Sequence, residues 1–373
     1  MITREHLYLL MARCCKKSQQ LAGLHFAEAD KNQLRDELVA YANAIYTLPV
    51  NRVNTENRDI HARLSILITQ MMRYLIESHN HPINPELEYV VKVLAQQWGI
   101  DLNTNIILFS HGDYAVRHYD ASVFQALTTN YHLALSKRPR IVFFPLEYDG
   151  DVLFSSVVFH EVGHMVENDK SLSGKVYDEL IKEIKNPRAT ILKNYFKLDY
   201  DQPAINEKRL RAYIKEYISD IFAAQYLGRN ILHYLNCHES LNRKENTSDH
   251  PCYECRERMI ESFMNYLSLN PHNTTDKFLQ IILGVFHNKV ADLDARDLNL
   301  SRDNLMLGNI HALANHNELF SLFSAAWRAS LSGINSVENA RGMVNGALSR
   351  LNYYDSINEA TKQSIDTFIA NNP

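Results

Sequence analysis

Apolar residues recur every three or four positions through about the first hundred residues of this 373-residue chain. The clearest runs are Leu34, Leu38, Tyr41 and Ile45, followed by Ile60, Leu64, Leu67 and Met71. This spacing gives each helix one apolar face, so it predicts helices over residues 1–98. The sequence Asn84-Pro85-Glu86 is typical of a helix start, and that helix is expected to end at Trp98-Gly99.

The pattern changes after residue 100. Three short runs rich in β-branched or aromatic residues predict a small three-stranded sheet, at Asn105–Phe109, Asn130–Leu135 and Arg140–Phe144. Helical spacing then returns and continues to the C-terminus. We therefore predict a mostly helical α+β protein with a helical N-terminal region (1–99), a core (100–268) and a helical C-terminal region (269–373).

Composition and charge limit the kind of protein. Lys and Arg number 39 against 43 Asp and Glu, and no dense basic cluster occurs, so nucleic acid is not an expected partner. The N-terminus lacks an export signal, and charged residues interrupt the longest apolar helix candidate, residues 60–76, so no membrane span is expected. Five cysteines at irregular spacing suit a reducing compartment, which predicts a cytoplasmic protein.

Candidate chemistry begins with an H-E-x-x-H motif, His160-Glu161-Val162-Gly163-His164, on a predicted helix after the third strand. The two imidazoles are just over one helical turn apart, so both can bind one zinc ion. Glu161 projects to the side, where it can act as general base on a water molecule without binding the metal. Gly163 lets another backbone approach beside the metal.

A catalytic zinc site needs a third protein ligand. The helix predicted at Tyr213–Leu227 offers Glu216 as that ligand and Asp220 as the carboxylate that orients a ligating histidine. The alternative is a solvated acidic face. The many apolar neighbours argue against it, because unpaired carboxylates are costly in a packed helix.

These motifs resemble a known family. H-E-x-G-H followed by E-x-x-x-D-x-x-A-A is similar to gluzincin zinc metallopeptidases. The segment His250-Pro251-Cys252-Tyr253-Glu254-Cys255-Arg256 resembles the H-P-x-x-x-x-R of the soluble catalytic core of the CAAX-prenyl-protease (Ste24-type and Oma1-type) family. The resemblance implies that His250 assists the oxyanion and that Arg256 braces the site by pairing with an acid.

The resemblance covers about residues 105–260. It implies a zincin-like core in which Asn130–Leu135 is the edge strand beside the substrate. Family members often have membrane helices and this chain shows none, and the first 100 and last 110 residues match no pattern of the family. Shorter phage-type and repressor-cleaving peptidases carry a similar E-x-x-x-D helix, but the spacing between His164 and Glu216 is long for that group.

The preferred hypothesis is a zinc-dependent endopeptidase with one Zn²⁺ per chain and a protein or peptide substrate. The alternative is a metal-stabilised binding or regulatory protein that cleaves nothing. Cys237, His238, Cys252 and Cys255 also permit a second, structural zinc site, although Cys252 and Cys255 are more simply buried helix residues. The sequence leaves the oligomeric state open.

Overall fold

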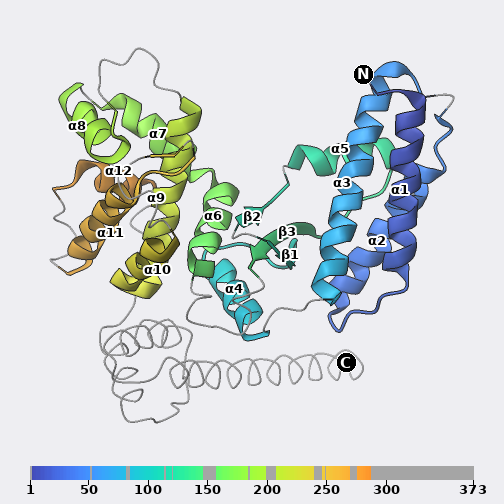
Figure 1. Ribbon diagram of the computed structural model, residues 1–373, viewed down its shortest axis with the longest axis horizontal. Helices are drawn as coiled ribbons and strands as arrows, with labels where there is room; N and C mark the ends of the chain where they lie inside the picture. Colours follow the sequence, from blue (N-terminus) through green and yellow to red (C-terminus); the bar gives the residue numbers. More distant parts are fainter. Residues whose placement is uncertain are drawn as a thin grey trace, which may run out of the picture. The chain divides into compact units, whose positions relative to one another are not determined.

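The computed structural model describes residues 2–50, 53–80, 85–112, 115–119, 121–145, 157–183, 185–198, 207–238, 246–247, 249–268 and 275–286. Their contacts divide them into two compact units. One unit combines Met1–Glu88 with Gly99–Asp149, and the other combines Tyr89–Trp98 with the described chain from Gly150 on. Figure 1 labels the elements of both units.

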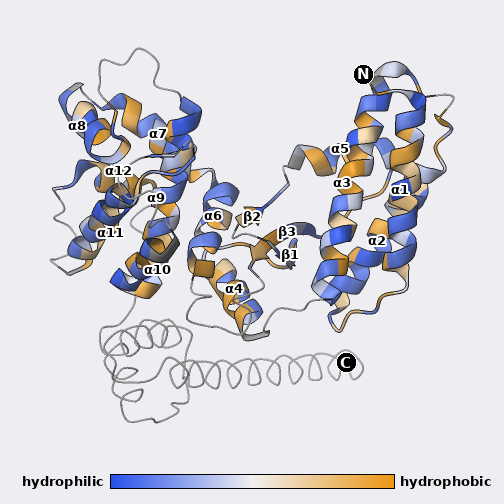
Figure 2. Cartoon of the chain, in the orientation of Figure 1, coloured by the Kyte–Doolittle hydropathy of each residue, from blue (hydrophilic) through white to orange (hydrophobic). Residues whose placement is uncertain are grey.

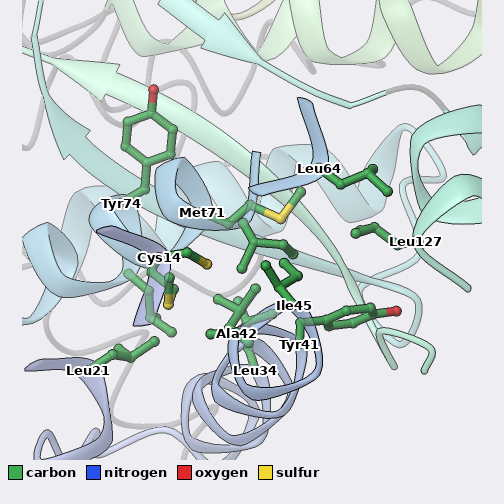
Figure 3. Packing of buried hydrophobic residues seen from close by; sticks show 14 of the residues in the cluster. Cys14, Leu21, Leu34, Tyr41, Ala42, Ile45, Leu64, Met71, Tyr74 and Leu127 are labelled. Carbon is green, nitrogen blue, oxygen red and sulfur yellow. The ribbon is translucent and has the colours of Figure 1, made fainter. Parts of the chain in front are cut away.

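Three helices dominate the first unit: α1 (Arg4–Ala22), α2 (Ala29–Tyr46) and α3 (Thr55–Asn80). Apolar and polar residues alternate along them, as in amphipathic helices (Figure 2). Their apolar faces meet in one core, which includes Cys14, Leu21, Leu34, Tyr41, Ala42, Ile45, Leu64 and Met71 (Figure 3). Each large apolar side chain buried there contributes roughly 1.5–3 kcal/mol. The helices predicted in this region are confirmed.

The same unit contains a small mixed sheet of β1 (Asn105–His111), β2 (Ala115–Arg117) and β3 (Arg138–Phe144) in the order β1-β3-β2. β1 runs parallel to β3, and β2 runs antiparallel to it. Helix α5 (Ala121–Tyr131) follows β2 in the connection that a parallel pair requires. The strands predicted at Asn105–Phe109 and Arg140–Phe144 are confirmed, each slightly longer than expected.

The strand predicted at Asn130–Leu135, and with it the proposed substrate edge, is wrong. Asn130 lies in the last turn of α5, which ends at Tyr131, and His132 has a positive φ of 55°. Leu133–Leu135 pair with no strand in the described part of the chain. Leu133 and Leu135 are half-buried and pack on the helical core, and the Tyr41 hydroxyl donates to the Leu133 carbonyl. A short run of aromatic and apolar residues can thus pack on helices without any strand partner. The third strand is instead β2, whose three residues are too few to show a pattern.

The second unit is helical in its described part. Its elements are the end of α4 (Pro85–Gln97), α6 (Val158–Lys170), α7 (Leu172–Lys182), α8 (Lys185–Phe196), α9 (Glu207–Leu227), a 3₁₀ turn (Gly228–Asn230), α10 (Ile231–His238), α11 (Tyr253–Ser268) and α12 (Lys277–Val285). Helix α9 packs against α6, α7 and α11. The predicted helix end at Trp98-Gly99 is confirmed: α4 ends at Gln97, and Gly99 has a positive φ of 78°.

The structure confirms a mostly helical α+β class with a three-stranded sheet. The contacts group the sheet with the N-terminal helices, and the domain boundaries expected at residues 99 and 268 remain predictions. Most of the expected C-terminal region, 269–373, lies outside the described residues, as does Asn84. No helix in the described part of the chain combines the length and apolar character needed to cross a membrane.

Candidate metal centre

Helix α6 carries the two histidines of the H-E-x-x-H motif. They project from one face, one turn apart, and their ring centroids are 4.6 Å apart with perpendicular planes. His160 is buried and His164 is partly exposed. The helix ends where Ser171 adopts a left-handed conformation with φ 50°, and α7 begins directly afterwards. The motif therefore lies within a regular helix, as the sequence predicts.

Helix α9 supplies the two carboxylates. Almost every residue from Tyr213 to Leu227 is buried, including Glu216 and Asp220, which are one turn apart on the same side of the helix. Carboxylates at buried positions require charged or hydrogen-bonding partners. Both find them on α6 and α11, so the alternative of a solvated acidic face is excluded.

The two helices come close at Gly163. A Cβ atom at this position would lie 2.8 Å from the Ser219 Cα and 3.0 Å from the Phe222 Cβ. The absence of a side chain at Gly163 lets α9 approach α6 one turn from Glu216. This confirms the expected backbone approach beside the motif.

The approach brings three donor groups together. Glu216 Oε2 lies 3.4 Å from His160 Nε2, and Glu216 Oε1 lies 3.3 Å from His164 Nε2. Donors about 2.0–2.2 Å from a tetrahedral zinc ion are about 3.3–3.6 Å apart. Each of these two distances, one to each Glu216 oxygen, agrees with that spacing, and the ligand atoms of all three residues lie within 4.8 Å of one another. Two imidazoles with one carboxylate are a donor set that suits zinc. His160, His164 and Glu216 are thus a group that can hold a metal ion.

The charges around this group favour a cation. Burial alone would lower the pKa of His160, but the nearby carboxylates of Asp220 and Glu216 outweigh it and raise that pKa to about 10. Burial would raise the pKa of Glu216, yet the charges of His164 and Arg256 and hydrogen bonds from both histidines hold it well below its usual range. The carboxylate therefore stays ionised at neutral pH. A divalent cation competes with the proton for the same donors.

Asp220 links His160 to Arg256. The Arg256 guanidinium donates two hydrogen bonds to this carboxylate, from Nε to Oδ2 at 2.8 Å and from a terminal nitrogen to Oδ1 at 2.6 Å. His160 Nδ1 lies 3.1 Å from Asp220 Oδ1, although the ring N–H is not aligned for a hydrogen bond. The arrangement brings an acid beside the ring nitrogen that faces away from the donor group. It also pairs Arg256 with an acid, as the family resemblance implies.

His250 approaches the donor group from the chain before α11. Its Nε2 lies 3.6 Å from Glu216 Oε1, and its side chain is 51% exposed. Thr247 holds the turn, because its Oγ1 accepts from the His250 N–H at 2.9 Å and its own N–H donates to the His250 carbonyl at 3.0 Å. The Tyr213 hydroxyl in turn donates to the Thr247 carbonyl at 2.5 Å. The loop that carries His250 is thereby anchored to α9.

Glu161 is buried beside the group, and its Oε2 has no hydrogen-bond partner in the described part of the chain. Burial raises its pKa, and the neighbouring histidines partly offset that effect. A buried carboxylate oxygen without a partner costs stability, and a catalytic role is one explanation of why such a group is retained. Its position next to the donors, without being one of them, is the one expected for a general base.

Sequence reasoning missed two supporting residues. Glu167 is 1% exposed and accepts from the Ser173 backbone N–H at 3.1 Å, with Lys215 Nζ 3.4 Å from its second oxygen. Tyr213 anchors the loop of His250. Glu167 lies one turn beyond His164 on the same side of α6, and Tyr213 lies one turn before Glu216, so helical spacing from these donor residues was the available signal.

The possible second zinc site is only partly described. Cys252 and Cys255 are buried free thiols whose Sγ atoms are 3.3 Å apart. The side chains of Cys237 and His238 lie outside the described residues. Among the side chains that the structure describes, His160, His164 and Glu216 form the one group suited to a metal ion.

Comparisons of the chain with protein-family models, with curated proteins and with solved structures find no match. What this group can do chemically therefore follows from its own geometry.

Proposed function

We propose that the protein is a zinc-dependent endopeptidase whose metal ligands are His160, His164 and Glu216. The observation that carries the proposal is the group of three donor residues, whose ligand atoms lie within 4.8 Å of one another, beside Glu161, whose Oε2 has no hydrogen-bond partner in the described part of the chain. A structural zinc site usually closes with four protein ligands and has no use for a general base. Three ligands plus an adjacent free carboxylate are what hydrolysis requires.

Different residues of the chain are assigned different steps of the hydrolysis. A zinc ion bound at this group supplies a Lewis acid for the scissile carbonyl and the attacking water. Glu161 takes the proton of that water and delivers it to the leaving amine. Asp220, held by Arg256, keeps the His160 ring oriented and increases its basicity.

His250 is proposed to donate a hydrogen bond to the oxyanion that forms during attack. Its exposed side chain lies next to the donor group without belonging to it, as a residue that donates to an oxyanion must. The positions of His250 and Arg256 around Glu216 also support the resemblance to the CAAX-prenyl-protease core. A protein or peptide substrate follows from this proposal.

One observation favours the alternative of a non-catalytic, metal-stabilised protein. His250 Nε2 is only 3.6 Å from Glu216 Oε1, so a small movement of its side chain would supply a fourth ligand and close the site. The two hypotheses differ in what His250→Ala does. As a fourth ligand its loss releases metal, whereas as an oxyanion donor its loss leaves zinc bound and lowers kcat more than it raises KM.

The deciding experiment measures zinc and hydrolysis in the same preparations. The wild-type protein is expected to bind about one zinc ion per chain, and His160→Ala and Glu216→Ala are each expected to lose most of it. Glu161→Gln is the matched control, because it is nearly isosteric and removes only the basic oxygen. It should keep zinc and thermal stability while hydrolysis of a broad peptide library falls by roughly 10²–10⁴-fold.

A fully zinc-loaded wild type that cleaves no peptide, tested also with its flanking regions removed, would contradict the endopeptidase. Retention of zinc and activity by Glu216→Ala would instead show that the third ligand is another acid.

A further inference from the structure

A pair of thiols lies outside the metal group but in the same chain segment. Cys252 immediately precedes α11, and Cys255 lies in the first turn of this helix, as in a C-x-x-C motif. Their Sγ atoms are 3.3 Å apart, and the two residues are 2% and 1% exposed. Two reduced thiols in direct contact at a helix start are arranged for disulfide formation, and a merely apolar role does not require that contact.

The surroundings stabilise negative charge on one sulfur. The Cys255 backbone N–H donates to the Cys252 carbonyl at 3.0 Å, and the Cys252 N–H donates to Asn246 Oδ1 at 2.8 Å, which fixes the backbone of the motif. The hydrogen bond with the Cys255 thiol is the main cause that lowers the pKa of Cys252, and the ammonium of Lys197 adds to it. The pKa of Cys255 is raised by the same hydrogen bond and by burial. Cys252 is thus the better nucleophile and Cys255 the partner that retains its proton.

Cys14 shows what a buried thiol without such a partner looks like. It is fully buried in the core of α1–α3, and burial raises its pKa to about 11. A thiol of that kind is almost entirely protonated at neutral pH and reacts slowly. Since Cys14 and Cys252 are both buried, the lowered pKa of Cys252 comes from its contact with Cys255 and from the nearby Lys197.

We propose that Cys252 and Cys255 form a redox-active dithiol that hydrogen peroxide converts to an intrachain disulfide. The Cys252 sulfur attacks one peroxide oxygen, the O–O bond breaks, and the second oxygen leaves as hydroxide, which takes up a proton to become water. The Cys255 sulfur then attacks the resulting sulfenic acid, its S–O bond breaks, and a second water leaves with the Cys255 proton. Two electrons pass from the sulfurs to the peroxide. The burial of both sulfurs favours a small oxidant.

The same segment connects this pair to the metal group. Arg256, which holds Asp220, is the next residue after Cys255, and His250 is two residues before Cys252. Forming the bond shortens the distance between the sulfurs from 3.3 Å to about 2 Å, which shifts the first turn of α11. We infer that oxidation displaces Arg256 and weakens zinc binding by about tenfold, the usual effect of losing an outer contact to a ligand. Any consequence for hydrolysis rests on the proposed function, but the thiol chemistry and zinc affinity do not.

The test treats the zinc-loaded full-length protein with dilute hydrogen peroxide, removes the peroxide, unfolds the protein in denaturant, alkylates the remaining thiols and maps them by mass spectrometry. We expect a cross-linked peptide pair containing Cys252 and Cys255, with Cys14 alkylated as the internal buried reference. Cys252→Ser and Cys255→Ser should each abolish the cross-link, and Cys14→Ser should not. If Cys252 and Cys255 of the wild type both stay alkylatable while half-buried Cys15 is oxidised, the proposal is overturned. This result is obtained with the wild type alone, so it does not depend on whether a variant folds.

Metal analysis separates the dithiol from a thiolate metal site. The zinc content of Cys252→Ser/Cys255→Ser should equal that of the wild type, and a loss of one metal equivalent would overturn the redox assignment. Chelator competition on oxidised and reduced wild type then tests the link to the metal group. An unchanged zinc affinity after complete oxidation would overturn that link. Because none of these readouts involves hydrolysis, failure of the endopeptidase proposal remains distinguishable.

Discussion

At the scale of single residues, Asp220 contacts two groups of the candidate metal centre. It is completely buried, lies beside the His160 ring and accepts two hydrogen bonds from Arg256. Burial would raise its pKa, but the charge of Arg256 lowers it overall. Removal of its charge therefore changes the surroundings of His160, and leaves buried Arg256 with only the Glu216 carboxylate 3.7 Å away.

Asp220→Asn is expected to reduce zinc affinity by about 10–100-fold, because His160 loses the acid that orients it. It should also lower the free energy of unfolding by about 3 kcal/mol, because buried Arg256 loses its hydrogen-bonded counterion and keeps only the Glu216 carboxylate, 3.7 Å away. Chelator competition and denaturant unfolding measure the two effects. Glu261→Gln is the control: it breaks the exposed Arg229–Glu261 pair and should cost about 1 kcal/mol or less. Unchanged zinc affinity in Asp220→Asn would assign Asp220 to stability alone.

A second residue-scale prediction concerns His61 in the first unit. Its Nδ1 lies 2.9 Å from the Tyr131 hydroxyl, and burial lowers its pKa from the usual value. The folded state thus favours the neutral ring, so the stabilisation is present above pH about 6.5 and is lost as the pH falls through the lower folded pKa. The wild type should lose more stability than His61→Gln when denaturant unfolding is compared at neutral and mildly acidic pH. Equal losses of stability in the two proteins would show that His61 does not contribute to the pH dependence of stability.

At the scale of elements, the crossing of α6 and α9 sets the distance between the histidines and Glu216. Gly163→Ala places a methyl group 2.8 Å from the Ser219 Cα, and backbone cannot move aside cheaply. The variant should be destabilised by about 1–3 kcal/mol and should bind zinc more weakly, since Glu216 lies one turn before Ser219.

Gly284→Ala is the matched control for this change. Gly284 is also helical, lies in α12, and no atom outside its own stretch of helix lies within 4 Å of the position that a Cβ would take there. Alanine favours helix more than glycine does, so the stability of Gly284→Ala should equal that of the wild type or be slightly higher. Thermal unfolding of both variants distinguishes a steric effect at the crossing from a general effect of replacing glycine. If Gly163→Ala were as stable as the wild type, α6 and α9 would not cross as closely at this position as the structure indicates.

The helices of this chain were easier to predict from the sequence than its strands. The helices were predictable because hardly any structure except a helix gives a 3.6-residue period over many residues. The strand expected at Asn130–Leu135 rested on its composition, a short run rich in β-branched or aromatic residues between turn-forming residues, and a helix end followed by a loop packed on α2 has that composition equally well. β2 was missed because Ala115–Arg117 is exposed or half-buried and too short to show a period.

At the scale of the whole molecule, the chain has two compact units, each with its own buried residues. The donor group lies wholly within the second unit, between α6 and α9. A ligand that binds only the folded state stabilises the unit that holds it. Metal removal should therefore lower the stability of the second unit more than that of the first.

Hydrogen exchange with and without a zinc chelator tests this expectation. Amide protection in α6 and α9 should fall when zinc is removed, and protection in α1–α3 should change little. His160→Ala is the control, because it should show the metal-free pattern whether or not chelator is present. Equal loss of protection in both units would mean that they unfold as one cooperative body.

The sequence alone determined the features that arise within a few residues of one another. The one-turn spacing of His160 and His164 follows from the helix itself, and the helical periods of the N-terminal region follow from local hydrogen bonding and one buried face. Tertiary structure decided which distant groups meet: Glu216 with both histidines, Arg256 with Asp220, and the turn of His250 with Glu216. These meetings depend on how closely α9 approaches α6 at Gly163 and on how α11 packs against α9. Such approach distances result from side-chain packing over the whole unit, and no local spacing in the chain encodes them.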